Sequence, residues 1–136
     1  VAAPDYLTIN GAPQNPDVLL NHTLIASSAG SMAHDWQFSS SNKKAPQILR
    51  IKPRLTVTSN QGAINAAKQG LGIARVISYQ VADELACGEL QEVLADYKLP
   101  DIPIHIVHRE GRMASNKVRC FIDLIAKRLR ADKILN

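Results

Sequence analysis

Short apolar runs separated by turn residues fill most of the first hundred positions. "HTLIA" at 22–26 is a nearly continuous apolar run, and "IARVI" at 73–77 and "ELQEVL" at 89–94 are two more. "RLTVT" at 54–58 alternates apolar and polar side chains. Runs this short, bounded by turn residues, are typical of strands rather than helices. We therefore predict strands in all four segments.

A hairpin is predicted between the runs at 22–26 and 54–58. Trp36 and Phe38 alternate with the polar Gln37, and "QILRI" at 47–51 follows a serine-rich turn. Two short alternating segments joined by such a turn favour antiparallel pairing. Pro53 then ends the hairpin and separates it from the strand at 54–58.

The stretch "TSNQGAINAAKQGLGIARV", residues 58–76, predicts a helix between two strands. Ser59 or Asn60 can cap its first turn, because their side-chain oxygens accept hydrogen bonds from free backbone N–H groups. Gly70 stands where a left-handed C-terminal cap is needed, and Leu71 is the expected hydrophobic partner of that cap. Mostly small side chains form the apolar stripe and allow the helix to lie close to a sheet. The stripe consists of Ala63, Ala67 and Leu71, with Ile64 beside it.

A second helix is predicted over "YQVADELAC", with Ser78 as its cap and Gly88 at its end. The order is then strand, helix, strand, helix, strand, with short connections. That order predicts a parallel α/β sheet with right-handed crossovers.

Two further helices flank this α/β region. Asn15 and Pro16 predict a short helix with Val18, Leu19 and Leu20 inside, since proline is favoured in a first turn. Beyond the corner formed by Pro100 and Pro103, we predict a strand at 104–108 and a helix at 115–130 that Ser115 caps. The apolar stripe of that last helix consists of Val118, Phe121, Ile122, Ile125 and Leu129.

Composition narrows the class of protein only slightly. A chain of 136 residues is one domain at most, and an apolar fraction of 46% allows an ordinary core. The net charge is +4, but the cations are scattered between Arg50, Lys52 and Arg54 and a second group in 117–133. Because no aromatic residues are interleaved with them, solvated basic faces are a better interpretation than a nucleic-acid surface.

No catalytic, metal or cofactor site is predicted. In "GLG" at 70–72 the helix comes before the glycines and the strand after them, which is the reverse of a dinucleotide-binding motif. His105 and His108 are three apart on a predicted strand and so face opposite sides. The serines do not stand in a nucleophile-elbow sequence. We therefore expect a protein that is not an enzyme and that binds no cofactor.

Cys87 and Cys120 are the only cysteines. Two cysteines in helical segments give neither a disulfide framework nor zinc-ligand spacing. We predict that both are buried and that the protein works in a reducing compartment. No apolar run is long enough to cross a membrane.

Polar residues follow three of the predicted strands, and these ends meet at one edge of a parallel sheet. Ligands collect at the carboxyl ends of parallel strands, where helix N-termini present free N–H groups. Any single one of these residues is explained better as an ordinary helix cap, worth about 1 kcal/mol. Three polar ends at one edge nevertheless favour a cleft for a small polar or anionic molecule. The candidate residues are Ser27, Ser28, Thr58, Ser59, Asn60 and Ser78.

One long segment carries a family resemblance. "TVTSNQGAINAAKQGLGIARVISYQVADELACGELQEVL" strongly resembles the second half of the effector-binding domain of LysR-type transcriptional regulators. "VAAPDYL", "HTLIA", "PIHIVHRE" and "SNKVRCFIDLIAKRL" follow in the order of that family, so the resemblance covers essentially the whole chain. It implies a fold like the type II periplasmic binding proteins, in which two α/β subdomains with parallel sheets and helices on both faces enclose a ligand cleft.

The resemblance also implies a domain organisation. Residues from about 5 to 95 would form the second regulatory subdomain, and residues from about 100 to 136 would return into the first. The winged helix-turn-helix that precedes this domain in the family is absent, so the regulator would bind DNA only through that missing part. A chain that opens on "VAAPDYL" without methionine is expected to be a fragment of a longer polypeptide.

In function, the resemblance implies a ligand-sensing module of a cytoplasmic regulator that assembles as a dimer or tetramer. The helix at 79–87 would pack against a partner chain, and Thr58, Ser59 and Asn60 would be the strongest effector contacts, with Ser27, Ser28 and Ser78 weaker. Two alternatives share the fold. One is a small-solute-binding protein, which the specific resemblance of residues 58–94 disfavours. The other is an enzyme, for which no acid, base or nucleophile can be named.

Overall fold

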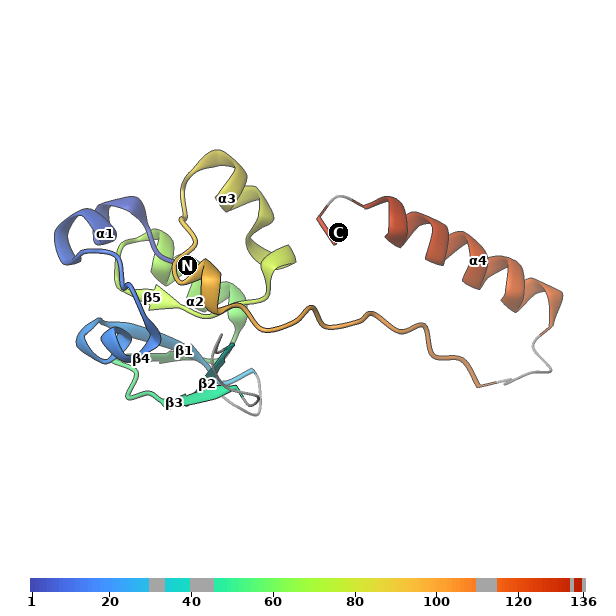
Figure 1. The fold of residues 1–136 in the computed structure, drawn as a ribbon. Helices are drawn as coiled ribbons and strands as arrows, with labels where there is room; N and C mark the ends of the chain where they lie inside the picture. The colour runs from blue at the N-terminus through green and yellow to red at the C-terminus, as the bar shows by residue number, and fades with distance from the viewer. Residues whose placement is uncertain (30–33, 40–45, 110–114, 133, 136) are drawn as a thin grey trace. The chain divides into compact units, whose positions relative to one another are not determined.

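The computed structural model describes residues 1–29, 34–39, 46–109, 115–132 and 134–135. Its contacts divide the chain into two units, Val1–Pro100 and Asp101–Asn136 (Figure 1). We call them unit 1 and unit 2.

Unit 1 contains all the described strands. Its elements, in chain order, are α1 (Pro4–Asn10), the 3-10 helix η1 (Pro16–Asn21), β1 (Leu24–Ser27), β2 (Asp35–Phe38), β3 (Gln47–Arg50), β4 (Leu55–Val57), α2 (Asn60–Lys68), β5 (Ile73–Ala74), the 3-10 helix η2 (Ser78–Val81), α3 (Ala82–Cys87) and the 3-10 helix η3 (Ala95–Tyr97).

Three of these strands form a parallel sheet in the order β4-β1-β5. The register pairs Ile25 of β1 with Leu55 of β4 and with Ala74 of β5. The predicted hairpin is confirmed, since β2 pairs antiparallel with β3. Positions 40–45 of the predicted turn lie outside the described residues.

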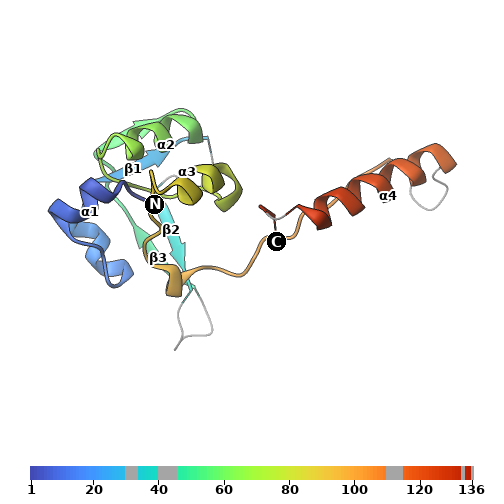
Figure 2. The ribbon, with the colours of Figure 1, turned by 90° about the horizontal axis from the view of Figure 1, so that it is seen from above.

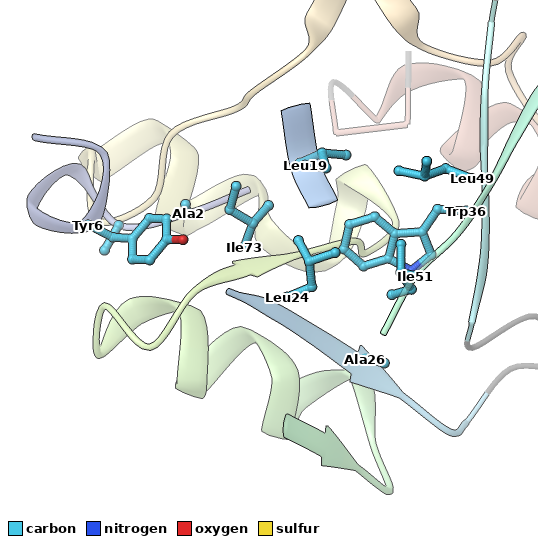
Figure 3. Packing of buried hydrophobic residues seen from close by; sticks show 10 residues of the cluster. Ala2, Tyr6, Leu19, Leu24, Ala26, Trp36, Leu49, Ile51 and Ile73 are labelled. Carbon is cyan, nitrogen blue, oxygen red and sulfur yellow. The ribbon is translucent and has the colours of Figure 1, made fainter. Parts of the chain in front are cut away.

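The central strand β1 contributes to both faces of the sheet, because successive side chains of a strand point in opposite directions. Leu24 and Ala26 belong to one buried cluster, which Figure 3 shows together with residues of α1, η1 and the hairpin, among them Tyr6 and Trp36. Ile25 belongs to a second cluster, between the sheet and α2. The sheet therefore has helices on both faces, and in Figure 2 α2 runs beside β1 with the hairpin on the other side of the unit.

Helix α2 begins and ends as predicted. Its N-cap is Ser59, whose hydroxyl oxygen accepts the N–H of Gly62 at 3.1 Å. At the other end Gly70 has a φ of 72°, and the N–H groups of Gly70 and Leu71 donate to earlier carbonyls of the helix. These two hydrogen bonds are the pair that defines a Schellman cap. The expected packing of Leu71 is wrong, because its side chain is 54% exposed, and Ile64 is buried instead.

Gly72 allows two strands to approach each other. A Cβ built on this residue would lie 2.4 Å from the carbonyl oxygen of Thr23, and its φ is 154°. The same oxygen accepts the N–H of Ile73 at 2.8 Å, where β5 begins to pair with β1. The two glycines of "GLG" thus do different work, one in ending a helix and one in seating a strand.

Several predicted elements are wrong in extent or kind. Residues 89–94 form no strand in the parallel sheet, and Gln91 makes only one antiparallel bridge, with Ala2. The edge of β5 is used by Val1, whose amine donates to the oxygen of Ala74 at 2.8 Å and whose oxygen accepts the N–H of Ala74 at 2.9 Å. The chain start therefore takes the place where the last strand was expected.

The predictions for helices also need correction. Ser78 opens the 3-10 helix η2, and α3 begins only at Ala82 without a side-chain cap. The helix α1 was not predicted at all, although Pro4 occupies its first turn. Asn15 does cap η1, yet only Leu19 of its three apolar residues is buried there.

Unit 2 contains one described helix, α4 (Asn116–Ala131), as predicted. The strand predicted at 104–108 does not form, and every described residue from 101 to 109 is exposed. No residue of α4 is buried, and Phe121 in its apolar stripe is 61% exposed. Cys120 of α4 is exposed, as is Cys87 of α3, so the predicted burial of both cysteines is wrong. Within the described residues, no helix combines the length and apolar character needed to span a membrane.

Candidate ligand-binding edge

Two of the three predicted polar segments meet at the carboxyl edge of the parallel sheet. Ser27, the last residue of β1, is in register with Val57, the last residue of β4. The N–H of Ser28 donates to the carbonyl oxygen of Val57 at 2.8 Å, and the Ser28 hydroxyl lies 3.3 Å from the same oxygen. The loop after β1 is therefore fixed beside Thr58, which begins the loop after β4.

Ser59 and Asn60 are held by different partners. The Ser59 hydroxyl is engaged in the cap of α2, and the absence of a Cβ at Gly62 leaves room for it, since a Cβ there would lie 3.3 Å from that oxygen. The Asn60 side chain donates from Nδ2 to Oε1 of Gln80 at 3.0 Å. Ser59 is thus committed to the helix, whereas Asn60 connects α2 with η2.

The third segment reaches the edge through Gln80 rather than through Ser78. Ser78 lies four positions beyond the end of β5 and is exposed, and its side chain makes no hydrogen bond to another described residue. Sequence reasoning missed Gln80, because its position depends on how η2 folds back over the first turn of α2. No local pattern around Gln80 signals that contact.

Backbone donors at this edge are free to hold an anion. The first N–H groups of a helix have no partner within the helix, and Ser59 satisfies only that of Gly62. The N–H groups of Asn60 and Gln61 remain, and the first turn of α2 contains no acidic residue. The helix dipole therefore places a partial positive charge here that its own side chains do not cancel.

Arg75 adds a cation after the third strand. It directly follows Ala74 at the end of β5, and burial lowers the pKa of its guanidinium. An arginine stays protonated at neutral pH even with a lowered pKa. Sequence reasoning missed this residue too, although a charged residue next to a buried strand end was a visible signal.

Two hollows of the surface are lined by residues that do not belong to this edge. One, of about 310 Å³, is lined by residues of α1 and of the C-terminal end of α2. Its Lys68 pairs with Glu89 at 2.6 Å and with Glu84 at 3.5 Å, and the hydrogen bond to Glu89 is the main reason that the pKa of Lys68 is raised. The other, of about 580 Å³, runs along α4. Neither hollow brings together residues from several strand ends, so the carboxyl edge remains the better candidate.

Comparison with known proteins defines the class. The chain matches the family model of the LysR substrate binding domain over residues 1–130, and it belongs to that family. It is 30% identical over 125 residues to the uncharacterized HTH-type transcriptional regulator YhjC of Escherichia coli (strain K12), and the match covers 92% of this chain and 42% of that protein.

A second relative, an uncharacterized HTH-type transcriptional regulator of Haemophilus influenzae, is 36% identical over 119 residues, which is 86% of this chain and 40% of that protein. The chain therefore spans about two fifths of the length of these relatives.

Solved structures show the same fold. The regulatory domain of CrgA, a LysR-type transcriptional regulator from Neisseria meningitidis, aligns with a TM-score of 0.74 at 22% identity, over 93% of this chain and 61% of that one. The regulatory domain of AphB in Vibrio vulnificus aligns with a TM-score of 0.69 at 20% identity, over the same shares. The predicted α/β fold of the type II periplasmic-binding-protein kind is confirmed, and so is the resemblance read from the sequence.

Proposed function

We propose that this chain is part of the effector-sensing domain of a DNA-binding transcriptional regulator, in which binding of a small molecule controls transcription. The observation that carries the proposal is the linkage of three loops at one edge. The bond from Ser28 to Val57 joins the loops after β1 and β4, and the bond from Asn60 to Gln80 joins α2 to η2. A ligand that contacts this edge can therefore act on three segments of the chain at once.

The chemistry of the edge suits a small polar or anionic effector, such as a carboxylate. Thr58 is exposed, and the first turn of α2 offers backbone N–H groups with a partial positive charge. Asn60 supplies an amide that can exchange its bond with Gln80 for one with a ligand. Ser27 and Ser28 belong to the neighbouring loop, Ser59 contributes through its backbone, and Ser78 opens η2, which reaches the edge through Gln80.

In the whole regulator, operator recognition belongs to a winged helix-turn-helix that precedes this domain. We place the protein in the cytoplasm, where the chromosome is, and assign it no catalytic step. We also propose that it assembles as a dimer or tetramer. A solute-binding protein of the same fold is the second candidate, but the relatives that match over most of this chain are named as transcriptional regulators.

Replacement of Thr58 or Asn60 by alanine in the full-length regulator tests the site. A hydrogen bond to a charged group contributes about 1.5–3 kcal/mol, so each variant should bind the effector at least several-fold more weakly. Operator binding without effector should be retained. A thermal-shift screen of small carboxylates supplies the ligand, and calorimetric titration of the folded variants measures its affinity.

Gln61→Ala is the matched control. Gln61 stands in the same helical turn, but its side chain bonds along the helix to Asn65 at 3.1 Å. Its loss should change effector affinity little. Unchanged affinity in both Thr58→Ala and Asn60→Ala would refute the site, and a lower thermal stability alone would leave these residues as structural caps.

A further inference from the structure

The nine residues from Arg50 to Thr58 alternate strictly between exposed and more buried positions. The exposed positions are the even ones, while Ile51 is only 2% exposed and the other odd positions are partly buried. Three cations therefore occupy exposed positions on the connection between the end of β3 and the start of β4, where the chain bends at Arg54. We call these residues, Arg50, Lys52 and Arg54, the basic row.

The backbone holds the basic row in place at both ends. The N–H of Ile51 donates to the carbonyl oxygen of His34 at 2.8 Å, and the N–H of Arg54 donates to that of Leu24 at 3.0 Å. These two bonds anchor the connection between β3 and β4 at Ile51 and at Arg54. Two residues of fully extended chain span about 6.6 Å, so the backbone positions of the three cations lie within roughly 13 Å of one another.

The charge of the basic row is largely uncompensated. Asp35 stands opposite Arg50 in the hairpin ladder and shares its face, so it offsets one end of the row. None of the three cations forms an ion pair with a described residue, in contrast to Lys98, which pairs with Glu92 at 2.8 Å. A fixed row of exposed positive charge is a surface for a polyanion.

The sequence alone favoured solvated basic faces, but the structure anchors these three cations close together at exposed positions and without ion pairs. We therefore propose that the basic row contacts the phosphate backbone of duplex DNA without reading its sequence. The inference goes beyond the proposed function, in which the helix-turn-helix recognises the operator, and it rests on that function because a duplex would reach this surface only in a DNA-binding regulator. Duplex DNA carries one charge per roughly 1.7 Å, so several phosphates lie along the length of the row. Phosphate contacts of lysine and arginine fix position on the duplex and carry no sequence information.

A duplex fits the row better than a single strand does. Unpaired bases need aromatic side chains to stack on. Trp36 of the neighbouring strand β2 is only 4% exposed, because it is packed in the core of unit 1. The row therefore offers charge without a stacking platform.

The test measures how salt weakens the binding of non-operator duplex DNA by the full-length regulator, without effector. Fluorescence anisotropy between about 50 and 200 mM potassium chloride gives the slope of log affinity against log salt, which is about −0.9 for each phosphate neutralised. In the variant R50Q/K52Q/R54Q that slope should become shallower by about 2.7. The parent should then lose roughly 40-fold more affinity than the variant over this range of salt.

A variant of α4, K117Q/K127Q/R128Q, is the matched control. It removes the same charge from exposed positions of unit 2 and should leave the slope near that of the parent. An unchanged slope in the variant of the row would overturn the proposal, and so would an equal change in both variants, which would mean that only net charge matters. A variant of the row that keeps the parent's slope but loses transcription activation would place an acidic protein there instead of DNA.

The result is independent of the effector site. The DNA carries no operator and no effector is present, so failure of Thr58→Ala or Asn60→Ala to weaken effector binding would leave this measurement intact. Conversely, a regulator whose slope does not depend on the basic row can still respond to an effector.

Discussion

Units 1 and 2 carry similar apolar patterns but bury them very differently. In unit 1, β1 lies between β4 and β5, and Leu24, Ile25 and Ala26 are all at most 2% exposed. In unit 2, α4 has an equally regular apolar stripe, yet Phe121 is 61% exposed, and Ile104 before it is 60% exposed. An apolar stripe shows that a face can be covered, whereas burial requires a second element that fits against it. In unit 1 the chain itself supplies that element.

The largest loss of stability in unit 1 is expected from a substitution at Gly72. Substitution by alanine should lower the free energy of unfolding of unit 1 by about 2–6 kcal/mol, the sum of a strained φ and an overpacked contact. The added Cβ would lie 2.4 Å from the Thr23 oxygen, a backbone atom that cannot move without disturbing the pairing of β5. Urea unfolding followed by the fluorescence of Trp36, the single tryptophan, reports unit 1 directly.

Gly70→Ala is the control for backbone strain alone. Gly70 also has a positive φ, of 72°, but a Cβ there would meet nothing within 4 Å. Its cost should be about 1 kcal/mol, and neither change should alter the helicity of α4. Equal costs at Gly70 and Gly72 would mean that the contact with Thr23 does not matter.

An isoleucine-to-alanine substitution in each unit tests the difference in burial between them. Ile25→Ala should cost about 2–5 kcal/mol, because Ile25 is 1% exposed and its loss leaves a cavity. Ile104→Ala, at a position that is 60% exposed, should change stability by no more than about 0.5 kcal/mol.

For self-association the order of the two substitutions should be reversed, with the larger effect from Ile104→Ala. Exposed apolar residues drive association, so the purified chain should form larger species unless the rest of its domain accompanies it. Ile104→Ala should reduce the mass measured by light scattering, while Ile25→Ala should not do so without unfolding. A monodisperse monomer of the parent chain at high concentration would contradict this part of the comparison.

A smaller effect comes from the start of unit 1. In a chain whose first residue is Val1, burial lowers the pKa of the amine to about 6, and Glu92 opposes that shift. The unfolded chain then binds more protons than the folded chain between about pH 6 and 8, so the free energy of unfolding should rise with pH across that window. The rise should be at most about 2–3 kcal/mol.

Acetylation of the Val1 amine is the control for that titration. It removes the charge and should flatten the dependence of unfolding on pH. A slope that survives acetylation would assign the titration to another group.

Local signals explain the parts of the fold that the sequence predicted well. The cap at Ser59 and the left-handed Gly70 define α2 almost to the residue, because each acts within one helical turn. The hairpin of β2 and β3 follows in the same way from alternation around a turn. Strand pairing at the far edge of the sheet was not predictable, since Val1 takes the place beside β5 from more than seventy positions away.

The contacts of the candidate site can likewise be divided into those that the sequence predicted and those that it did not. Ser27, Ser28 and Thr58 could be placed together because parallel strands bring their carboxyl ends to one edge. The contact of Asn60 with Gln80 could not, since it depends on the path of the chain after β5. General rules of topology therefore located the edge, and only the structure showed which side chains meet there.

Because β1 contributes residues to both buried clusters, it also determines how unit 1 unfolds. Leu24 and Ala26 are part of one cluster and Ile25 is part of the other, so neither layer can separate from the sheet without exposing apolar surface of the same strand. Segments that share buried residues open together as one cooperative unit. The amide hydrogens of β1, β4 and α2 should then exchange with solvent through a single global opening, while the ends of α4 exchange by fraying.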